Sequence, residues 1–471
     1  MIEVKLAWLA KAVEGKINTQ SVDDMLIRSV STDTRSLQAG DVFIALVGDN
    51  FNGHEYVAKA IEKGASAVIA SQVVDCPLPV IQVSDTTIAL GKLAAAVKAK
   101  VKPKTVGITG SSGKTTVKEM VASILSKKGK VLATKGNFNN EIGVPLTLLE
   151  LSKDDEFAVV EMGANHQGEI DYTTALVKPD AATIVNAAPS HLEGFGSLFG
   201  VARAKSEIFN GLNQHGVAVL NTDSQFYEFW QGKSDTHRIV SFSPSSELGD
   251  FHATDTFINS DGCAEFNLVT PKGQVAIRLR IPGSHNIGNG ILAAALAMQV
   301  GAELADVQSG LFDMRTVKGR LNVSTIGENL RVIDDSYNAN VASVKAGIDL
   351  LLTFTGPKVL VFGDMGELGD QSQMYHQQIG EYAHSNGVDA LLSIGKLSEH
   401  ASRVFADTGA HCADLDELMH HLGVLTNAAN KANKTPVNVL VKGSRSAKME
   451  RVIDAINKQY QSTKTQETKP C

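Results

Sequence analysis

The 471-residue sequence is poor in cysteine and has no long hydrophobic run. No uninterrupted apolar stretch approaches the ~20 residues that a membrane-spanning helix needs, and the first residues lack the basic start and apolar segment of a signal peptide. We therefore expect a soluble, cytoplasmic protein without stable membrane association. The 4 cysteines lack Cys-x-x-Cys spacing, so we expect free thiols rather than a disulfide framework or a zinc site. They are Cys76, Cys263, Cys412 and Cys471.

An excess of basic charge is also missing. The chain has 44 Lys and Arg residues against 51 Asp and Glu residues, for a net charge of -7. This balance disfavours a nucleic acid or an anionic membrane as the main partner. With 43% hydrophobic and 20% charged residues, the composition is typical of a globular protein. The chain is too long for one hydrophobic core, so we expect about three domains.

Short apolar runs alternate with helical patterns, which predicts an α/β protein. Residues 1–83 are expected to form a small α/β domain with strands at 42–46, 67–69 and 80–83. Residues 84–313 are expected to form a central domain with a parallel sheet wrapped by helices. Residues 314–471 are expected to form a third, Rossmann-like α/β domain, whose polar tail from residue 458 frays.

The two larger domains carry the clearest element signals. In the central domain a helix at 87–100 is followed by buried-looking strands at 105–109, 157–161, 182–186 and 217–220. Between residues 251 and 281 apolar and polar residues alternate around turn signals, which predicts an antiparallel insertion. A helix at 287–300 closes this domain. In the third domain the predicted strands lie at 330–334, 358–362, 390–394 and 437–441.

The most specific motif is a glycine-rich loop between a predicted strand and an amphipathic helix. Its backbone N–H groups and the positive end of the helix suit phosphates, Lys114 can reach the outer phosphates, and the Thr115 hydroxyl can ligate magnesium. Ile108 stands where such loops usually have their first glycine. An incidental turn is the alternative, but the flanking elements favour an ATP and magnesium site. The loop consists of Thr109, Gly110, Ser111, Ser112, Gly113, Lys114, Thr115 and Thr116.

Three further residues are candidates for the same site. Glu161 ends a predicted strand of the parallel sheet, at the edge that faces the nucleotide, and could hold magnesium. His191 follows the next strand at the same edge. Lys205 lies within the apolar stripe of a predicted helix, where desolvation favours the neutral amine. The simpler alternatives are a surface glutamate, a hydrogen-bonding loop histidine and a lysine whose amine reaches the surface.

Later segments supply candidate nucleotide contacts. Asn286 and Asn289 stand at the start of an alanine-rich helix, where their amides could read an adenine edge or cap the helix. Arg320 offers a guanidinium fork for phosphate, although most lone arginines are surface residues. Asp335 follows a strand and could bind ribose hydroxyls or a cation, or start a turn.

Taken together, these segments resemble the Mur ligases, the ATP-dependent amide-bond formers of peptidoglycan precursor synthesis. Residues 335–340 and 442–445 resemble those of the member that adds D-alanyl-D-alanine. Val341 replaces the proline usual there, which should loosen the turn without removing a functional group. The resemblance rests on residues 109–116, 136–145, 161–164, 191, 204–205, 285–289 and 319–320.

The N-terminal segment narrows the resemblance to the later enzymes of the pathway. Residues 31–35, residues 40–46 and the pair Gly53-His54 are similar to their uridine-nucleotide domain. Earlier members have a Rossmann-like domain at this place, and no Gly-x-Gly-x-x-Gly follows the first strand here. Loop charges on a solvated edge are the alternative interpretation of residues 33–35.

The resemblance implies a ligase that joins D-alanyl-D-alanine to UDP-N-acetylmuramoyl-tripeptide, acting as a monomer on small-molecule substrates. The tripeptide carboxylate would attack the γ-phosphate of ATP, and the dipeptide amine would then displace phosphate from the acyl phosphate. Positioning and charge neutralisation are the main tasks of such an enzyme. The product would be a pentapeptide precursor of the cell wall.

The resemblance also implies residue roles. Lys114, Glu161, His191 and Lys205 would be catalytic. The magnesium ligands would be Thr115, Glu161, His191 and a carbamylated Lys205. Besides the phosphate loop, nucleotide would contact Asn137, Asn286, Asn289, Arg320 and Asp335. Substrate would contact Ser31, Asp33, Thr34, Arg35, Asn139, Asn140, Asn338 and Ser343.

Two other functions remain open from the sequence. One is a related ligase that adds a single amino acid to a muramoyl peptide or to folate. The other is a nucleotide switch whose phosphate loop times partner binding. Switches that use GTP usually carry an Asn-Lys-x-Asp motif, and the sequence has none.

Overall fold

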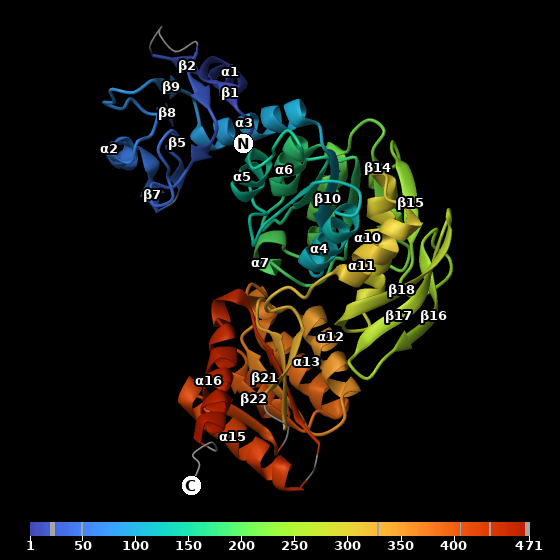
Figure 1. Cartoon of the computed structure of the whole chain (residues 1–471). Helices are drawn as coiled ribbons and strands as arrows, with labels where there is room; N and C mark the ends of the chain where they lie inside the picture. Colours follow the sequence, from blue (N-terminus) through green and yellow to red (C-terminus); the bar gives the residue numbers. More distant parts are fainter. Residues whose placement is uncertain (19–23, 49, 327–328, 406, 433–434, 467–471) are drawn as a thin grey trace.

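The structure is a computed structural model that describes residues 1–18, 24–48, 50–326, 329–405, 407–432 and 435–466. Three α/β domains follow one another along the chain, from the N-terminal domain (blue) to the C-terminal domain (orange and red) in Figure 1. This confirms the predicted fold class. No helix in the described ranges combines the length and hydropathy needed to cross a bilayer. Cys76, Cys263 and Cys412 are free thiols, whereas Cys471 lies outside the described residues.

The N-terminal domain is built on a 5-stranded sheet with the order β2-β9-β8-β5-β4. The predicted strands are present as β5 (Val42–Ile44), β8 (Ala67–Ala70) and β9 (Val80–Gln82). The other elements are short and left no clear sequence pattern. They are β1 (Val4–Lys5), α1 (Leu6–Ala12), β2 (Lys16–Ile17), β3 (Leu26–Ile27), β4 (Val30–Ser31), β6 (Val47–Gly48), β7 (Phe51–Asn52), η1 (Gly53–Tyr56) and α2 (Val57–Glu62).

Helix α3 (Thr86–Val101) joins the N-terminal domain to the central domain. Its first turn is capped by Asp85, whose side chain accepts hydrogen bonds from the N–H groups of Thr87 and Ile88. The buried face of α3 belongs to one apolar core that runs from Ile2 through Leu90 to Trp230. The two domains therefore share a core instead of meeting across a polar interface.

The central sheet has 6 parallel strands in the order β11-β12-β10-β13-β14-β15. Its strands are continuously apolar because helices cover both faces: α3, α5, α6 and α8 on one, and α4, α10 and α11 on the other. The strands are β10 (Lys104–Thr109), β11 (Val131–Ala133), β12 (Phe157–Glu161), β13 (Ala181–Ile184), β14 (Val217–Asn221) and β15 (Arg238–Phe242). The helices are α4 (Lys114–Leu125), α5 (Gly143–Leu149), α6 (Glu169–Val177), α7 (Leu192–Phe195), α8 (Leu198–Ser206), η2 (Glu207–Gly211), α9 (Tyr227–Lys233), α10 (Asn286–Gln299) and α11 (Leu304–Asp313).

The predicted insertion is a 3-stranded antiparallel sheet of β16 (His252–Ile258), β17 (Cys263–Thr270) and β18 (Gly273–Pro282). Inward-facing residues of β17 and β18, such as Phe266 and Leu279, belong to the same core as α4 and α10. The insertion is thus anchored on the central domain.

The C-terminal sheet has 6 strands in the order β19-β20-β24-β21-β22-β23, and only β19 is antiparallel to its neighbour. The polar tail was expected to fray from Lys458, but in the described part α16 continues to Gln466. Tyr460 packs against the apolar core and its hydroxyl lies 2.7 Å from the Thr426 hydroxyl. The strands are β19 (Asn322–Ile326), β20 (Leu330–Asp335), β21 (Lys358–Gly363), β22 (Ala390–Ile394), β23 (Gly409–Cys412) and β24 (Val437–Lys442). The helices are α12 (Val341–Thr353), η3 (Gly369–Gln371), α13 (Ser372–Ser385), α14 (Glu399–Val404), α15 (Leu415–Ala432), η4 (Arg445–Ala447) and α16 (Glu450–Gln466).

Helix α12 begins at Val341, the residue that replaces the expected proline. Asn340 and Ser343 exchange hydrogen bonds across the first turn, each side chain accepting from the backbone N–H of the other. This reciprocal cap fixes the turn between β20 and α12 at the edge of the sheet that faces the central domain.

The packing of α11 on α4 generates a stability prediction. Gly310 lies so close to α4 that an added Cβ would stand 2.4 Å from Cα of Ile124. The Ser123 hydroxyl also donates a 2.6 Å hydrogen bond to the Gly310 carbonyl. We expect Gly310→Ala to force the helices apart and to lower the free energy of unfolding by about 1 to 3 kcal/mol, measured by thermal unfolding.

Gly232 provides the matched control, because nothing lies within 4 Å of its added Cβ in helix α9. Gly232→Ala should leave stability unchanged or raise it by up to about 1 kcal/mol. Equal effects of the two substitutions would contradict the close-packing argument.

Candidate active site

The phosphate loop connects β10 to α4 and is braced by the segment that follows β13. Gly113 has a φ of 77°, in the left-handed region that favours glycine, and α4 begins directly after it. Asn186 holds the loop: its carbonyl accepts from the N–H of Ser111 at 3.0 Å, and its side-chain oxygen accepts from the N–H of Ser112 at 3.0 Å. Sequence reasoning missed a role for Asn186, although it is the last residue of the strand predicted at 182–186.

Lys114 folds back over the loop and donates a 2.7 Å hydrogen bond to the carbonyl of Gly110. Burial lowers the pKa of Lys114, the nearby Glu161 carboxylate opposes this effect, and the Arg320 guanidinium adds to it. The amine therefore lies where the protein provides little compensating negative charge, and a bound polyphosphate would provide it.

Glu161 ends β12, beside the loop, and only 2% of it is exposed. Its carboxylate accepts two hydrogen bonds, from the Thr115 hydroxyl at 3.0 Å and from the Asn139 amide at 2.9 Å. The structure thus brings together the expected magnesium ligands Thr115 and Glu161. Asn139, expected to contact substrate, contacts this carboxylate instead of lining the large cavity described below.

His191 begins the short helix α7 and has a left-handed backbone with a φ of 51°. The preceding Ser190 donates a 3.0 Å hydrogen bond to Ser111, so this segment lies against the phosphate loop. Nδ1 of His191 lies 2.5 Å from Oε2 of Glu367, a residue of the C-terminal domain that sequence reasoning missed. Contact with the imidazole lowers the pKa of Glu367 below its usual range, against the effect of burial.

Lys205 lies on α8 with only 1% of its surface exposed, so its amine does not reach solvent. Burial, together with the charge of Lys114, holds the pKa of Lys205 well below its ordinary value. Its Nζ lies 6.0 Å from the ring centroid of Phe195, the residue whose ring also meets His191 edge-on.

The side chains of Thr115, Glu161, His191 and Lys205 fit a magnesium ion that is bound together with a polyphosphate. A hydroxyl, a carboxylate and phosphate oxygens are ligands that magnesium prefers. In the described ranges there is no cluster of three or more His, Cys, Asp and Glu side chains suited to a metal, so this site would depend on Thr115 and a modified Lys205 as well. A neutral, desolvated amine is the form that reacts with carbon dioxide, and burial favours that form of Lys205.

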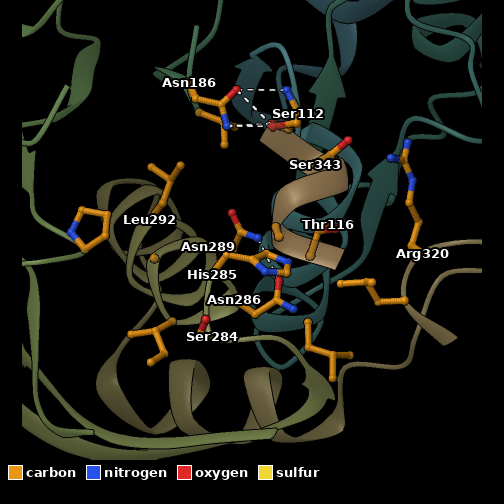
Figure 2. A pocket seen from close by; sticks show the side chains of 18 of the residues that line it. Ser112, Thr116, Asn186, Ser284, His285, Asn286, Asn289, Leu292, Arg320 and Ser343 are labelled. Atoms are coloured by element: carbon orange, nitrogen blue, oxygen red, sulfur yellow. Dashed lines mark hydrogen bonds between the residues drawn. The ribbon is translucent and has the colours of Figure 1, made fainter. Parts of the chain in front are cut away.

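A cavity of about 590 Å³ opens beside the loop, between the central and C-terminal domains. Figure 2 shows Asn286 and Asn289 of α10 on one side, Ser112 and Asn186 above them, and Arg320 and Ser343 of the C-terminal domain on the other. Predicted residues in its lining are Ser112, Gly113, Thr116, Asn286, Asn289, Arg320, Asp335 and Ser343. Lining residues that the sequence did not point out include Asn186, Asn221, Phe242, Pro244 and Thr316.

The polar groups of this cavity are preoriented. The Asn289 amide donates a 2.8 Å hydrogen bond to Asn286, which leaves the Asn289 oxygen close to Gly113. The Arg320 guanidinium stacks on the ring of Tyr337 at 4.4 Å. Asp335 forms a buried ion pair with Lys442.

Other predicted residues lie apart from this cavity. Asn137 is exposed and does not line it, and the Asn140 side chain caps α5 by accepting from the N–H of Gly143 at 2.9 Å. Asn338 accepts from its neighbour Ala339 at 2.9 Å. Their ligand contacts stay predictions.

The residues expected to bind the uridine nucleotide lie in the N-terminal domain, at the end of β4 and in the segment that follows it. Arg35 forms a two-pronged contact with Asp33, and its hydrogen bond lowers the pKa of that carboxyl. Ser31 is buried and accepts from the N–H of Asp33 at 3.3 Å, while Thr34 is also buried. Their role stays a prediction too.

Comparison with known proteins follows the same division of the chain. Residues 26–98 match the profile described as "Mur ligase family, catalytic domain". Residues 108–297 match the profile described as "Mur ligase middle domain". Residues 319–445 match the profile described as "Mur ligase, glutamate ligase domain". The chain is 45% identical to the UDP-N-acetylmuramoyl-tripeptide--D-alanyl-D-alanine ligase of Escherichia coli K12, over 97% of this chain and 99% of that one. It is 34% identical to the ligase of the same name from Bacillus subtilis, over 96% and 98%.

Solved structures agree with this assignment. A crystal structure of MurF from Acinetobacter baumannii has a TM-score of 0.90 at 36% identity and covers 96% of this chain and 98% of that chain. MurF ligase from Thermotoga maritima in complex with ADP has a TM-score of 0.80 at 28% identity, over 93% and 99%. From these matches over nearly its whole length, the chain belongs to the Mur ligase family.

Proposed function

We propose that the chain is an ATP-dependent ligase that joins D-alanyl-D-alanine to UDP-N-acetylmuramoyl-tripeptide and releases ADP and phosphate. The observation that supports it most directly is the convergence of Lys114, Glu161 and Lys205 at a phosphate loop beside a cavity between two domains. The near-complete coverage of relatives with this printed activity supports the choice of substrates. The product is the pentapeptide precursor of the cell wall.

The reaction has two steps. An oxygen of the tripeptide carboxylate forms a bond to the γ-phosphorus of ATP as the bond to the β-phosphate oxygen breaks, which gives an acyl phosphate and ADP. The dipeptide amine then forms the C–N bond, loses a proton, and phosphate leaves. The chain's task is to align these groups and offset their negative charge.

Residues of the central domain serve the first step. The N-terminus of α4 and the amine of Lys114 would face the phosphates, and Arg320 would add a second cation from the C-terminal domain. Thr115, Glu161, His191 and a carbamylated Lys205 would hold magnesium. When bound, magnesium neutralises charge on the transferred phosphoryl group. The asparagines of α10 would contact adenine, and the Asp335 carboxylate, beside its Lys442 partner, would contact ribose.

We divide these tasks among three domains. Residues 1–83 would bind the uridine nucleotide through Ser31, Asp33, Thr34 and Arg35. Residues 84–313 would bind ATP, and residues 314–471 would receive the dipeptide near Asn338 and Ser343. Asn137, Asn139 and Asn140 precede α5 and are proposed to support nucleotide and peptide at the loop edge. We further propose a monomer that works in the cytoplasm.

The substrate assignment predicts a specific acceptor. Phosphate release from ATP should require UDP-N-acetylmuramoyl-tripeptide together with D-alanyl-D-alanine, measured with tripeptides ending in diaminopimelate and in lysine. Diaminopimelate, lysine or glutamate offered in place of the dipeptide should give no release. Release with a single amino acid but never with the dipeptide would show a different ligase of this family, and slow hydrolysis indifferent to every acceptor would favour a nucleotide switch.

The modification of Lys205 can be tested directly. Lys205→Ala should lower turnover by about 100-fold or more because a ligand of the phosphoryl site is lost, and added formate or acetate should restore part of it. The exposed Lys153 is the control, and Lys153→Ala should leave turnover unchanged.

A second measurement follows from the lowered pKa of Lys205. Because the amine is neutral over a wider pH range than an ordinary lysine, protein equilibrated with ¹³C-bicarbonate should keep a carbamate signal in ¹³C NMR towards neutral pH. The signal should be absent from Lys205→Ala. Full activity of Lys205→Arg, which cannot form a carbamate, would remove the role.

A further inference from the structure

Glu367 reaches from the C-terminal domain to the His191 segment of the central domain. It lies in the loop between β21 and η3, and its Oε2 is 2.5 Å from Nδ1 of His191. Its backbone carbonyl also accepts a 3.0 Å hydrogen bond from the N–H of Leu192. The contact therefore involves both the side chain and the main chain of Glu367.

Both residues of this contact have unusual backbones. Glu367 has a φ of 62° and His191 a φ of 51°, in the left-handed region where a non-glycine residue costs roughly 1 to 2 kcal/mol. Such conformations persist where surrounding contacts hold them, and they occur often at functional sites. Here the two strained residues face each other across the domain boundary.

The base of the Glu367 loop is fixed to the C-terminal domain. His376 is fully buried, and its Nε2 accepts from the N–H of Met365 at 2.9 Å. The Asp364 carboxylate accepts from the N–H groups of Leu397 at 3.0 Å and Ser398 at 2.8 Å. The position of Glu367 thus follows the position of the whole domain.

A second contact crosses the same boundary. The Asn340 amide, at the start of α12, donates a 3.4 Å hydrogen bond to the carbonyl of Ser111 in the phosphate loop. The C-terminal domain therefore touches both the phosphate loop and the His191 segment when it is docked as in this structure.

We infer that Glu367 is a positioning residue that orients the His191 imidazole for its metal only when the C-terminal domain is docked. Oε2 of Glu367 lies 2.5 Å from Nδ1 but out of line for a hydrogen bond in this structure. Once the ring turns so that Nδ1–H points at the carboxylate, the contact fixes the tautomer and leaves Nε2 as a metal ligand, an arrangement common in metal sites. The inference rests on the proposed function, which makes His191 a magnesium ligand. Its consequence is that metal affinity and domain docking are coupled.

The test measures binding of manganese, a spectroscopic substitute for magnesium, to the full-length protein with ADP. Free Mn²⁺ is counted by electron paramagnetic resonance. Glu367→Ala should weaken Mn²⁺ binding by about 10- to 100-fold, the usual cost of losing such a partner. Glu367→Gln, which keeps an oxygen within reach, should lose less. The control is Asp370→Ala, which removes an exposed carboxylate a few residues further on and should bind like the wild type.

A double substitution separates positioning from a general structural effect. If Glu367 acts through His191, then Glu367→Ala should cause no further loss of Mn²⁺ binding in a His191→Ala background. Circular dichroism checks that each variant is folded, and Glu367→Gln replaces Glu367→Ala in the cycle if the latter is not.

The outcomes are distinct. Unchanged Mn²⁺ binding in Glu367→Ala, or an equal loss with and without His191, would overturn the positioning role and leave the proposed function intact. Failure of the wild-type protein to take up ADP and Mn²⁺ at all would overturn the proposed function and, with it, the positioning role.

Discussion

The hydrogen bond from the Thr115 hydroxyl to the Glu161 carboxylate joins the start of α4, directly after the phosphate loop, to β12, the strand beside β10 in the sheet. The rest of the site is arranged around this contact. The contact exists because β12 and β10 are parallel neighbours, so that their carboxyl ends reach the same edge of the sheet. On the other side of β10, β13 brings Asn186 and then His191 to that edge. Strand order thus assembles residues that are far apart in the sequence.

Around this edge the chain concentrates positive charge that it does not fully neutralise. Burial, together with the charge of Lys114, lowers the pKa of Lys205, and burial, together with the Arg320 guanidinium, lowers the pKa of Lys114. Repulsion between these cations raises the free energy of the site without a ligand, so a bound polyanion is stabilised more strongly. The buried pair of Lys442 and Asp335, by contrast, is already satisfied within the protein. The cations available to a ligand are therefore those beside the loop.

Much of this could be predicted from the sequence, and the limits have physical causes. Long apolar strands and the strand-loop-helix around Lys114 leave strong local patterns, so the fold class and the meeting of Thr115 with Glu161 were predicted. Strands of two or three residues, such as β11, leave no such pattern. Glu367 could not be predicted because its role depends on a contact between two domains, and local periodicity carries no information about docking. The helical end of α16 was missed because its residues are polar and its contact with the core, from Tyr460 to Thr426, joins residues distant in the sequence.

The shared core around α3 has a consequence for how the molecule can move. Bending between the first two domains would open apolar packing that runs without a break from one sheet to the other. The apolar clusters of the third domain, among the described residues, contain no residue of the other two. We therefore expect the first two domains to move as one body, with a fixed distance between their sheets. A long ligand that binds the first domain by one end would then hold its other end at a fixed distance from the phosphate loop. Ligands that are shorter or longer would not bring their reactive end to the loop.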